Sequence, residues 1–588
     1  MLISYGFSSG LIRLLPIVTA TSVFAQLQPI PISFPEQASS EAALNVVLDN
    51  FLGISWELSS FNTLWGDTPS ALPPAMQNYL VNIRDRLSNP LRIRVGGNAM
   101  DDSTYDPDYT DKMLEITDTN AYFNNIPVRF GPVLWDVMNA MAASVGDMQF
   151  VITLSMTDPD NYANDAQVAQ AAMQKLGDSL DAMLLGNEPD LYNKHGVIDD
   201  YELTDYIPEV GSVIQLFQND SLLTNTSRLL GGPTVCCNWD LIDVLQAGLT
   251  SYPEYKYFTV QHYPANICSG ADASNTNMTY FLTHSNVQNY VWWNDGNWRG
   301  INYAKSLNVP VILTEFNSVA CGGSNISDTF AMALWSVDVA LQAARANISG
   351  VYIHTREFNV TYNLFDPPAE GASMDAGWHT RPNYYSTLVL AETLSSTGSV
   401  VTELDVGNQL KTAAYSIHDN SGTTRSKLAL FNYMSSNIDS TEEDSSDSDL
   451  TRIFEIPANI TEDQIAIRYL LAPTVDFRTP WDSSDSGSQT GNVTWANQTV
   501  GSLGEMTGTQ ATTYLSCKDG CNVSVPAPGL AIVFILSNNT DSLYDGNDTE
   551  VATASVTYSG ASSLTGNWGS SRTLLLGLGF VLLLLSSN

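Results

Sequence analysis

The sequence predicts an α/β protein made of a (β/α)8 TIM barrel followed by a C-terminal β-sandwich domain. From residue 51 to residue 395, eight short apolar runs alternate with longer segments of helical spacing, which is the pattern of a barrel. After about residue 396 the helical spacing disappears, and short strand-like runs separated by Ser/Asp/Gly-rich loops replace it. A chain of 588 residues is also too long for one ordinary core.

The expected barrel occupies residues 46–397. Its strands read as near-continuous apolar runs, as buried parallel strands do: FLGISWE, LRIRVGG, QFVITLS, DAMLLGNE, RLLGGPT, YFTVQHY, VPVILTEF and GVYIHT. Helical spacing follows several of them, in segments such as PPAMQNYLVNIRDRL, DAQVAQAAMQKLG and SDTFAMALWSVDVALQAARA. The number of strand–helix units predicts the barrel.

The expected sandwich occupies residues 398–540. KTAAYSIHD, SKLALFNYM, QIAIRYLLA and PGLAIVFILS have the composition and the length of strands. Residues 26–45 form a separate N-terminal segment, and its stretch 27–34 is a candidate extra strand of the sandwich.

Both ends of the chain have the composition of targeting signals. Residues 1–25 combine one basic residue, a short apolar run and small residues before Gln26, which predicts a cleavable secretory signal; a membrane anchor is the alternative. Residues 541–572 form a Ser/Thr/Gly-rich linker with an attachment region, and residues 573–588 form a short apolar tail without a basic end. This pattern predicts a glycosylphosphatidylinositol (GPI) anchor, and therefore a secreted protein tethered at the cell surface or wall.

Further features agree with secretion. Asn-x-Ser/Thr sequons recur along the chain, at Asn219, Asn277, Asn325, Asn347, Asn359, Asn459, Asn497 and Asn522 among other positions. The six cysteines suit an oxidising compartment. Cys517 and Cys521 are spaced for a small-loop disulfide, whereas the pairing of Cys236, Cys237, Cys268 and Cys321 stays open.

Charge and residue spacing exclude several function classes. The formal net charge of -38 and the pI near 4.1 argue against a nucleic-acid partner, because a phosphate backbone would be repelled. The Cys and His spacings match no zinc pattern, so we expect no metal site and no cofactor. The only membrane contact expected is the GPI anchor, and the oligomeric state stays open.

Two apolar runs end in glutamate, and these residues are the candidate catalytic pair. Glu188 closes the fourth run in GNEP, and Glu315 closes the seventh in LTEF. Active sites of barrels lie at the C-terminal ends of the strands. Two carboxyl groups across the barrel mouth can cleave a glycosidic bond, with Glu188 as acid/base at a raised pKa and Glu315 as nucleophile. Either glutamate alone would more often be a surface or salt-bridge residue; the pair favours catalysis.

Neighbouring residues are candidates for binding the sugar. Asn187 could hydrogen-bond a hydroxyl next to the reacting carbon, and the hydroxyl of Tyr263 could position the nucleophile. His262 lies beside Tyr263, with a structural role as the favoured alternative. His354 and Trp378, near the eighth run, could line the sugar site or serve in ordinary packing.

The stretches LRIRVGGN, GNEPDLY, QHYP, TEFNSVACGG and GWHTRPNYYSTLVLAETL, with the β-rich tail, resemble glycoside hydrolase family 79. This family includes β-glucuronidases and heparanase, and the likeness is to its fungal secreted members. The resemblance implies a retaining mechanism with Glu188 as acid/base and Glu315 as nucleophile. It also implies that Glu57, Gly97 and Asn98 line the subsite for the terminal sugar.

The predicted activity is removal of terminal β-linked glucuronic acid, or its 4-O-methyl form, from extracellular glycans. The sugar carboxylate needs partners, and backbone N–H groups around Gly322 and Gly323 could supply them. Some family members have a tyrosine where this chain has Ala320, so a retaining β-glycosidase or transglycosylase acting on neutral wall glycans is one alternative. A non-catalytic glycan-binding protein is the other. Exo and endo action are not distinguished.

Overall fold

The structure is a computed structural model, and it describes residues 28–536 except 40–44, 122–124, 159–161, 225, 269–275, 370–376, 436–437, 439–449, 459–463 and 481–490. The predicted signal segment 1–25, linker 541–572 and tail 573–588 lie outside the described residues. Among the helices described, none combines the length and the apolar character needed to cross a bilayer.

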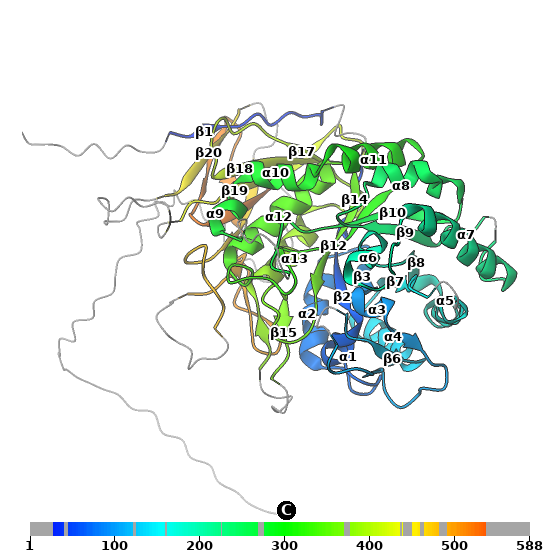
Figure 1. Ribbon diagram of the computed structural model, residues 1–588. Helices are drawn as coiled ribbons and strands as arrows, with labels where there is room; N and C mark the ends of the chain where they lie inside the picture. The colour runs from blue at the N-terminus through cyan, green and yellow to red at the C-terminus, as the bar shows by residue number, and fades with distance from the viewer. Residues whose placement is uncertain are drawn as a thin grey trace, which may run out of the picture.

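Eight parallel strands close into a barrel, which confirms the predicted fold class (Figure 1). They follow one another around the barrel in chain order, and each corresponds to one of the apolar runs. The strands are β2 (Leu52–Glu57), β3 (Leu91–Gly96), β7 (Met148–Leu154), β8 (Leu180–Leu185), β9 (Leu230–Val235), β10 (Tyr255–His262), β12 (Val311–Phe316) and β14 (Ile348–Thr355).

Helices connect the strands and surround the barrel, as Figure 1 shows. The longer ones are α2 (Pro74–Arg84), α4 (Val133–Val145), α5 (Ala163–Leu176), α7 (Leu203–Asn219), α8 (Leu241–Ala247), α10 (His284–Trp292), α11 (Asp295–Ser306), α12 (Phe330–Arg345) and α13 (Tyr385–Thr393). Short pieces lie in the loops: α1 (Phe61–Trp65), α3 (Asn98–Asp101), α6 (Tyr192–His195) and α9 (Met278–Phe281), the small strands β4 (Thr104–Tyr105), β5 (Leu114–Ile116) and β6 (Val128–Phe130), and the pairs β11 (Ala265–Asn266) with β13 (Val319–Ala320) and β15 (Phe365–Asp366) with β16 (His379–Thr380).

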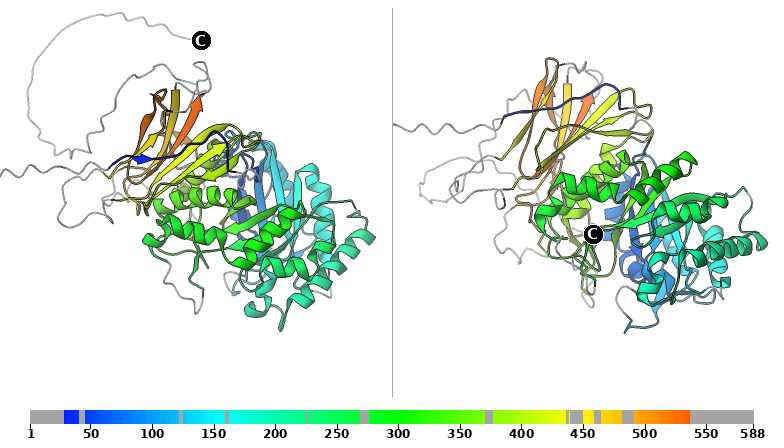
Figure 2. Two further views of the ribbon diagram at one scale, coloured as in Figure 1. Left: turned by 90° about the horizontal axis from the view of Figure 1, so that it is seen from above. Right: turned by 45° about the horizontal axis from the view of Figure 1, so that its top comes forward.

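The C-terminal domain is a sandwich of two sheets, which lies beside the barrel (Figure 2). The larger sheet contains β17 (Val400–Glu403), β18 (Thr412–His418), β19 (Arg425–Asn432), β27 (Gly529–Leu536), β21 (Gln464–Leu471), β22 (Thr494–Trp495) and β25 (Thr513–Ser516). The smaller sheet contains β1 (Ile30–Pro31), β20 (Arg452–Ile456) and β26 (Cys521–Val525). Strand β1 comes from the N-terminal segment and pairs in parallel with β20. A separate hairpin joins β23 (Thr499–Val500) to β24 (Met506–Thr507).

The larger sheet is buried on both faces, and this explains the continuous apolar run in β27. One set of alternating residues, including Leu428, Ile465 and Val533, packs in a core with the smaller sheet. The other set, including Phe431 and Ile532, belongs to the same core as the barrel. The sandwich is therefore joined to the barrel by a shared apolar core.

A buried polar network also crosses the boundary between the two domains. Asp338 of α12 accepts hydrogen bonds from the hydroxyls of Tyr415 and Tyr433 in the sandwich. His284 lies between two carboxylates, 2.8 Å from Asp338 and 3.0 Å from Glu403. Although burial lowers the pKa of His284, Asp338 and Glu403 outweigh it and raise the pKa to about 10.

All six cysteines form disulfides. Cys517 pairs with Cys521, as predicted. The four cysteines whose pairing stayed open form Cys268–Cys321, with 53 residues of sequence separation, and Cys236–Cys237, between neighbours in the chain.

Candidate active site

Glu188 lies in the turn that follows β8, at the C-terminal end of the barrel. Its backbone adopts a left-handed conformation with φ 48°, and Gly186 two residues earlier has φ 89°. These torsions end the strand before the helical turn Pro189–Leu191. Non-glycine residues seldom adopt positive φ, and such conformations concentrate at functional sites. The turn keeps a partly buried carboxyl group at the barrel mouth.

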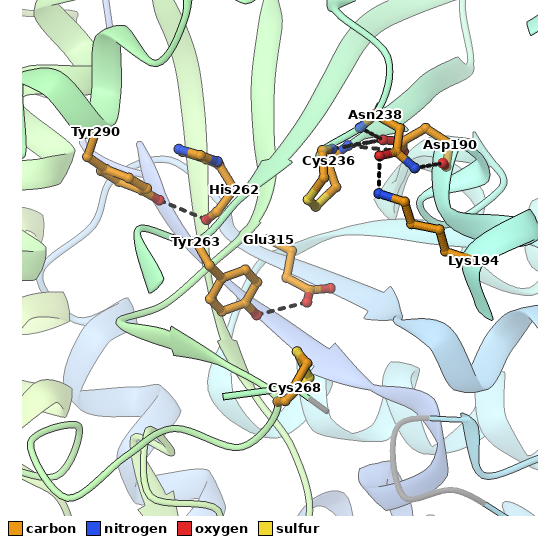
Figure 3. The surroundings of a disulfide bond; sticks show 11 residues. Asp190, Lys194, Cys236, Asn238, His262, Tyr263, Cys268, Tyr290 and Glu315 are labelled. Atoms are coloured by element: carbon orange, nitrogen blue, oxygen red, sulfur yellow. Dashed lines mark hydrogen bonds between the residues drawn. A yellow bond between two sulfur atoms is a disulfide. The ribbon is translucent and has the colours of Figure 1, made fainter. Parts of the chain in front are cut away.

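Glu315, three strands further on, is held by two partners. The Tyr263 hydroxyl donates a hydrogen bond of 2.8 Å to Oε1, and Arg94 Nη1 donates one of 2.8 Å to Oε2 (Tyr263 and Glu315 are drawn in Figure 3). Burial and the Glu315 carboxylate raise the pKa of Tyr263 well above its usual range, so its hydroxyl keeps the proton that it donates. Each oxygen of the Glu315 carboxyl group therefore accepts a hydrogen bond that fixes its position.

Arg94 links the two candidate catalytic regions. Its guanidinium is fully buried and donates to Glu315 and, over 2.6 Å, to Asn187 Oδ1, next to Glu188. Gln261 donates to the same Asn187 oxygen over 2.9 Å. The amide nitrogen of Asn187 donates over 2.5 Å to Asn98 Oδ1. This network fixes the orientation of Asn187 at the barrel mouth.

The two glutamates have different electrostatic environments. Burial, the neighbouring Glu315 carboxylate and Asp190 raise the pKa of Glu188 well above its usual range, while Arg94 opposes them. Two carboxyl groups that share a site do not readily ionise together. Arg94 and Tyr263 donate hydrogen bonds to Glu315, whereas the raised pKa of Glu188 favours its protonated form.

Glu57, at the end of β2, forms a third carboxylate at the mouth. It accepts a hydrogen bond of 2.8 Å from the Ala99 N–H, and it lies 3.4 Å from His354 and 3.9 Å from Arg356. Although burial alone would raise the pKa of Glu57, Arg356 and His354 outweigh it and lower the pKa. A Cβ on Gly97 (φ 78°) would lie 2.3 Å from a Glu57 oxygen, so only glycine fits there.

The loop after β12 contains Gly322 and is tied to the loop after β10. Ala265–Asn266 pairs with Val319–Ala320, and the Cys268–Cys321 disulfide closes the same connection. Gly322 accepts hydrogen bonds from Thr361 through its carbonyl, while the Gly323 N–H donates to the Val319 carbonyl over 3.0 Å. The Gly323 N–H is therefore engaged within the loop, contrary to the expectation that it faces a sugar carboxylate.

The structure does not bring two of the predicted binding residues to the carboxylates. The His262 ring stacks on Tyr290 at 4.7 Å and on Trp293 at 3.8 Å, and Figure 3 shows it turned away from Glu315. His262 lies on the face of β10 that packs on α10. Its surroundings therefore agree with the structural role that was the favoured alternative. Trp378 is buried beside Tyr79 and Phe365 in an aromatic cluster of the core.

Sequence reasoning missed Arg94, Gln261, Arg356 and Asp190 as site residues. Strand alternation could have identified Arg94, because it shares the inward face of β3 with Gly96. Gln261 precedes the predicted pair in QHY and faces the opposite way from His262. Asp190 lies two residues after Glu188, and only folding brings the loop after β9 against its carboxylate.

Comparison with known proteins agrees with this architecture. The model of the glycosyl hydrolase family 79 C-terminal beta domain matches residues 414–532. A β-glucuronidase of Neurospora crassa is 24% identical over 458 residues, covering 72% of this chain and 78% of the relative. A β-glucuronidase of Aspergillus niger is 25% identical over 439 residues, covering 68% and 75%.

A solved structure shares the fold. The 4-O-α-L-rhamnosyl-β-D-glucuronidase of Fusarium oxysporum 12S superimposes with a TM-score of 0.69 at 20% identity, over 86% of this chain and 100% of that one. The two relatives and the matched C-terminal domain show that this chain is a glycoside hydrolase, and its C-terminal domain is similar to that of family 79.

Proposed function

We propose that this protein is a retaining β-glucuronidase that removes terminal glucuronic acid, or its 4-O-methyl form, from extracellular glycans. The observation that carries the proposal is the unequal environment of the two glutamates. Glu315 is held as a carboxylate by Tyr263 and Arg94, whereas the pKa of Glu188 is raised. A nucleophile needs the first state and a general acid needs the second.

In the first step a Glu315 oxygen forms a bond to the anomeric carbon while the bond to the leaving oxygen breaks. That oxygen takes the proton of Glu188, which becomes a carboxylate. In the second step Glu188 takes a proton from water as the water oxygen bonds to the anomeric carbon, and Glu315 is released. Two displacements at one carbon retain its configuration.

Other residues position the terminal sugar. Asn187, held by Arg94 and Gln261, lies where it could bond the hydroxyl next to the reacting carbon. Glu57 and Asn98 complete a polar rim suited to sugar hydroxyls. Hydrogen bonds that strengthen as charge develops on the sugar ring would lower the activation free energy of glycoside cleavage.

The choice of glucuronic acid is supported by the two relatives, which are named β-glucuronidases. One observation favours a neutral sugar as the second candidate. Arg94 is bonded to Glu315, and Arg356 is bonded to Glu357 over 2.7 Å and lies near Glu57. Neither arginine is thus dedicated to a substrate carboxylate.

We also propose that the protein is secreted and tethered by a GPI anchor. Support comes from the composition of both ends and from the exposure of sequon residues such as Asn219, Asn325, Asn359, Asn497 and Asn522. Release of activity from intact cells by a phosphatidylinositol-specific phospholipase would test the tether; activity retained on the cells would contradict it.

The activity is tested with a chromogenic β-D-glucuronide and the matching β-D-glucoside across pH 3 to 7. Glu188→Gln and Glu315→Gln are the matched variants, since each replaces a carboxyl by an amide of the same shape. Cleavage of the glucuronide that is lost in both variants supports the function and the residues. Cleavage of the glucoside alone keeps the mechanism and overturns the sugar.

A further inference from the structure

The disulfide between Cys236 and Cys237 follows β9, the strand next to the one that leads to Glu188. A disulfide stabilises a fold mainly by restricting the unfolded chain, and this effect grows with the length of the loop that it closes. A bond between adjacent residues closes the shortest loop possible and joins no distant segments. Its contribution is therefore local, and it concerns the surface that the two sulfur atoms present.

The disulfide is held against the acid/base turn by Asp190. The Asp190 carboxylate accepts hydrogen bonds from the backbone N–H groups of Cys236 (3.1 Å), Cys237 (2.8 Å) and Asn238 (2.7 Å). Asn238 returns a side-chain hydrogen bond of 2.6 Å to the Asp190 carbonyl. Since Asp190 lies two residues after Glu188, these hydrogen bonds tie the disulfide loop to the turn that carries the proposed proton donor.

The other side of the loop is braced by aromatic rings. Trp239 stacks on Tyr201 at 6.2 Å and packs on Tyr206 at 5.8 Å. Cys236 is buried, while Cys237 is exposed. In Figure 3 the sulfur atoms at Cys236 point away from Asp190, toward the side of the barrel mouth where Glu315 and Tyr263 lie.

We propose that the Cys236–Cys237 disulfide is the wall of the subsite for the leaving-group sugar. The inference rests on the proposed function, because the proton of Glu188 goes to the leaving oxygen and the leaving group must lie on the Glu188 side. The disulfide offers a rigid, polarizable, apolar surface for the C–H face of a sugar ring. Lys194, which donates to Asn238 Oδ1, and Asn238 itself supply polar groups for hydroxyls at its edge.

Two substrates separate this subsite from the rest of the site. A β-D-glucuronosyl disaccharide has a sugar leaving group, whereas β-D-glucuronyl fluoride has a single atom that cannot reach the disulfide. In the Cys236→Ala/Cys237→Ala variant we expect kcat/KM for the disaccharide to fall about tenfold, while kcat/KM for the fluoride stays within about twofold. The control Cys517→Ala/Cys521→Ala removes another short-loop disulfide, from the sandwich. We expect its kcat/KM values for both substrates to equal those of wild type.

Equal losses on both substrates, or no loss on either, would overturn the proposal, because the disulfide would then act structurally or not at all. If the double variant does not accumulate, Lys194→Ala on the same wall gives the same comparison, and an unchanged ratio of the two kcat/KM values counts against the subsite. The matching β-D-glucosyl disaccharide and β-D-glucosyl fluoride are measured in parallel. If the wild-type enzyme cleaves only these glucosyl substrates, the proposed sugar is refuted. The comparison of glucosyl fluoride with glucosyl disaccharide then tests the leaving-group subsite.

Discussion

Replacing Arg94 with methionine should disable the nucleophile without disturbing the barrel elsewhere. Arg94 is fully buried, and it donates to Glu315 over 2.8 Å, to Asn187 over 2.6 Å and to Ser55 over 3.0 Å. Methionine fills a similar volume but carries no charge and no N–H. The variant therefore removes both the counter-charge of Glu315 and the clamp on Asn187.

The magnitude follows from these contacts. One hydrogen bond to a charged group contributes about 1.5 to 3 kcal/mol. If the bond to Glu315 is used fully in the transition state, its loss lowers kcat/KM about 10- to 150-fold. Breaking a buried ion pair costs about 3 to 5 kcal/mol of folding stability, and the 12% exposure of Glu315 places this pair at the lower end.

The assay is kcat/KM on the chromogenic glycoside together with the free energy of unfolding in urea. Arg92→Met is the matched control, because Arg92 lies two residues earlier on the same face of β3, beside the Ser349 carbonyl and away from Glu315. We expect its kcat/KM to stay within about threefold of wild type. An Arg94→Met enzyme with wild-type kcat/KM, or equal losses in both variants, would refute the reasoning.

Three further outcomes are expected. With a sugar leaving group, kcat/KM should fall as the pH rises through the raised pKa of Glu188, and Glu188→Ala acting on the glycosyl fluoride should lose this basic limb; a limb that persists would assign it to another group. His284, whose pKa is raised to about 10 beside Asp338, should stabilise the fold fully below pH 6.5 and lose this contribution as the pH rises through 10, so Tm should decline there in wild type but not in His284→Asn. Gly97→Ala should displace the Glu57 carboxylate and raise KM more than it lowers kcat, and an unchanged KM would count against Glu57 as a sugar ligand.

Much of this architecture was predictable because local patterns reflect local burial. The apolar runs correspond to the eight barrel strands, since a strand buried on both faces must be apolar along its length. The glutamates of GNEP and LTEF could be recognised because a charged residue at the end of a buried apolar strand is uncommon unless it has a function. The Cys517–Cys521 disulfide was predictable because the two cysteines are close enough in the chain for a small-loop bridge.

The tertiary structure alone decided which side chains meet across the barrel. Arg94 is one of several charged residues along the sequence, and only closure of the barrel brings it to Glu315 and Asn187, 221 and 93 residues away. His262 and Tyr263 are adjacent in the chain, but their side chains point to opposite sides. His262 packs on Trp293, whereas the Tyr263 hydroxyl donates to Glu315. The sequence by itself determined the elements and the residues that end them, because these depend on neighbours in the chain. The partners, the disulfide pairing and the raised pKa of Glu188 depend on distances that exist only after folding.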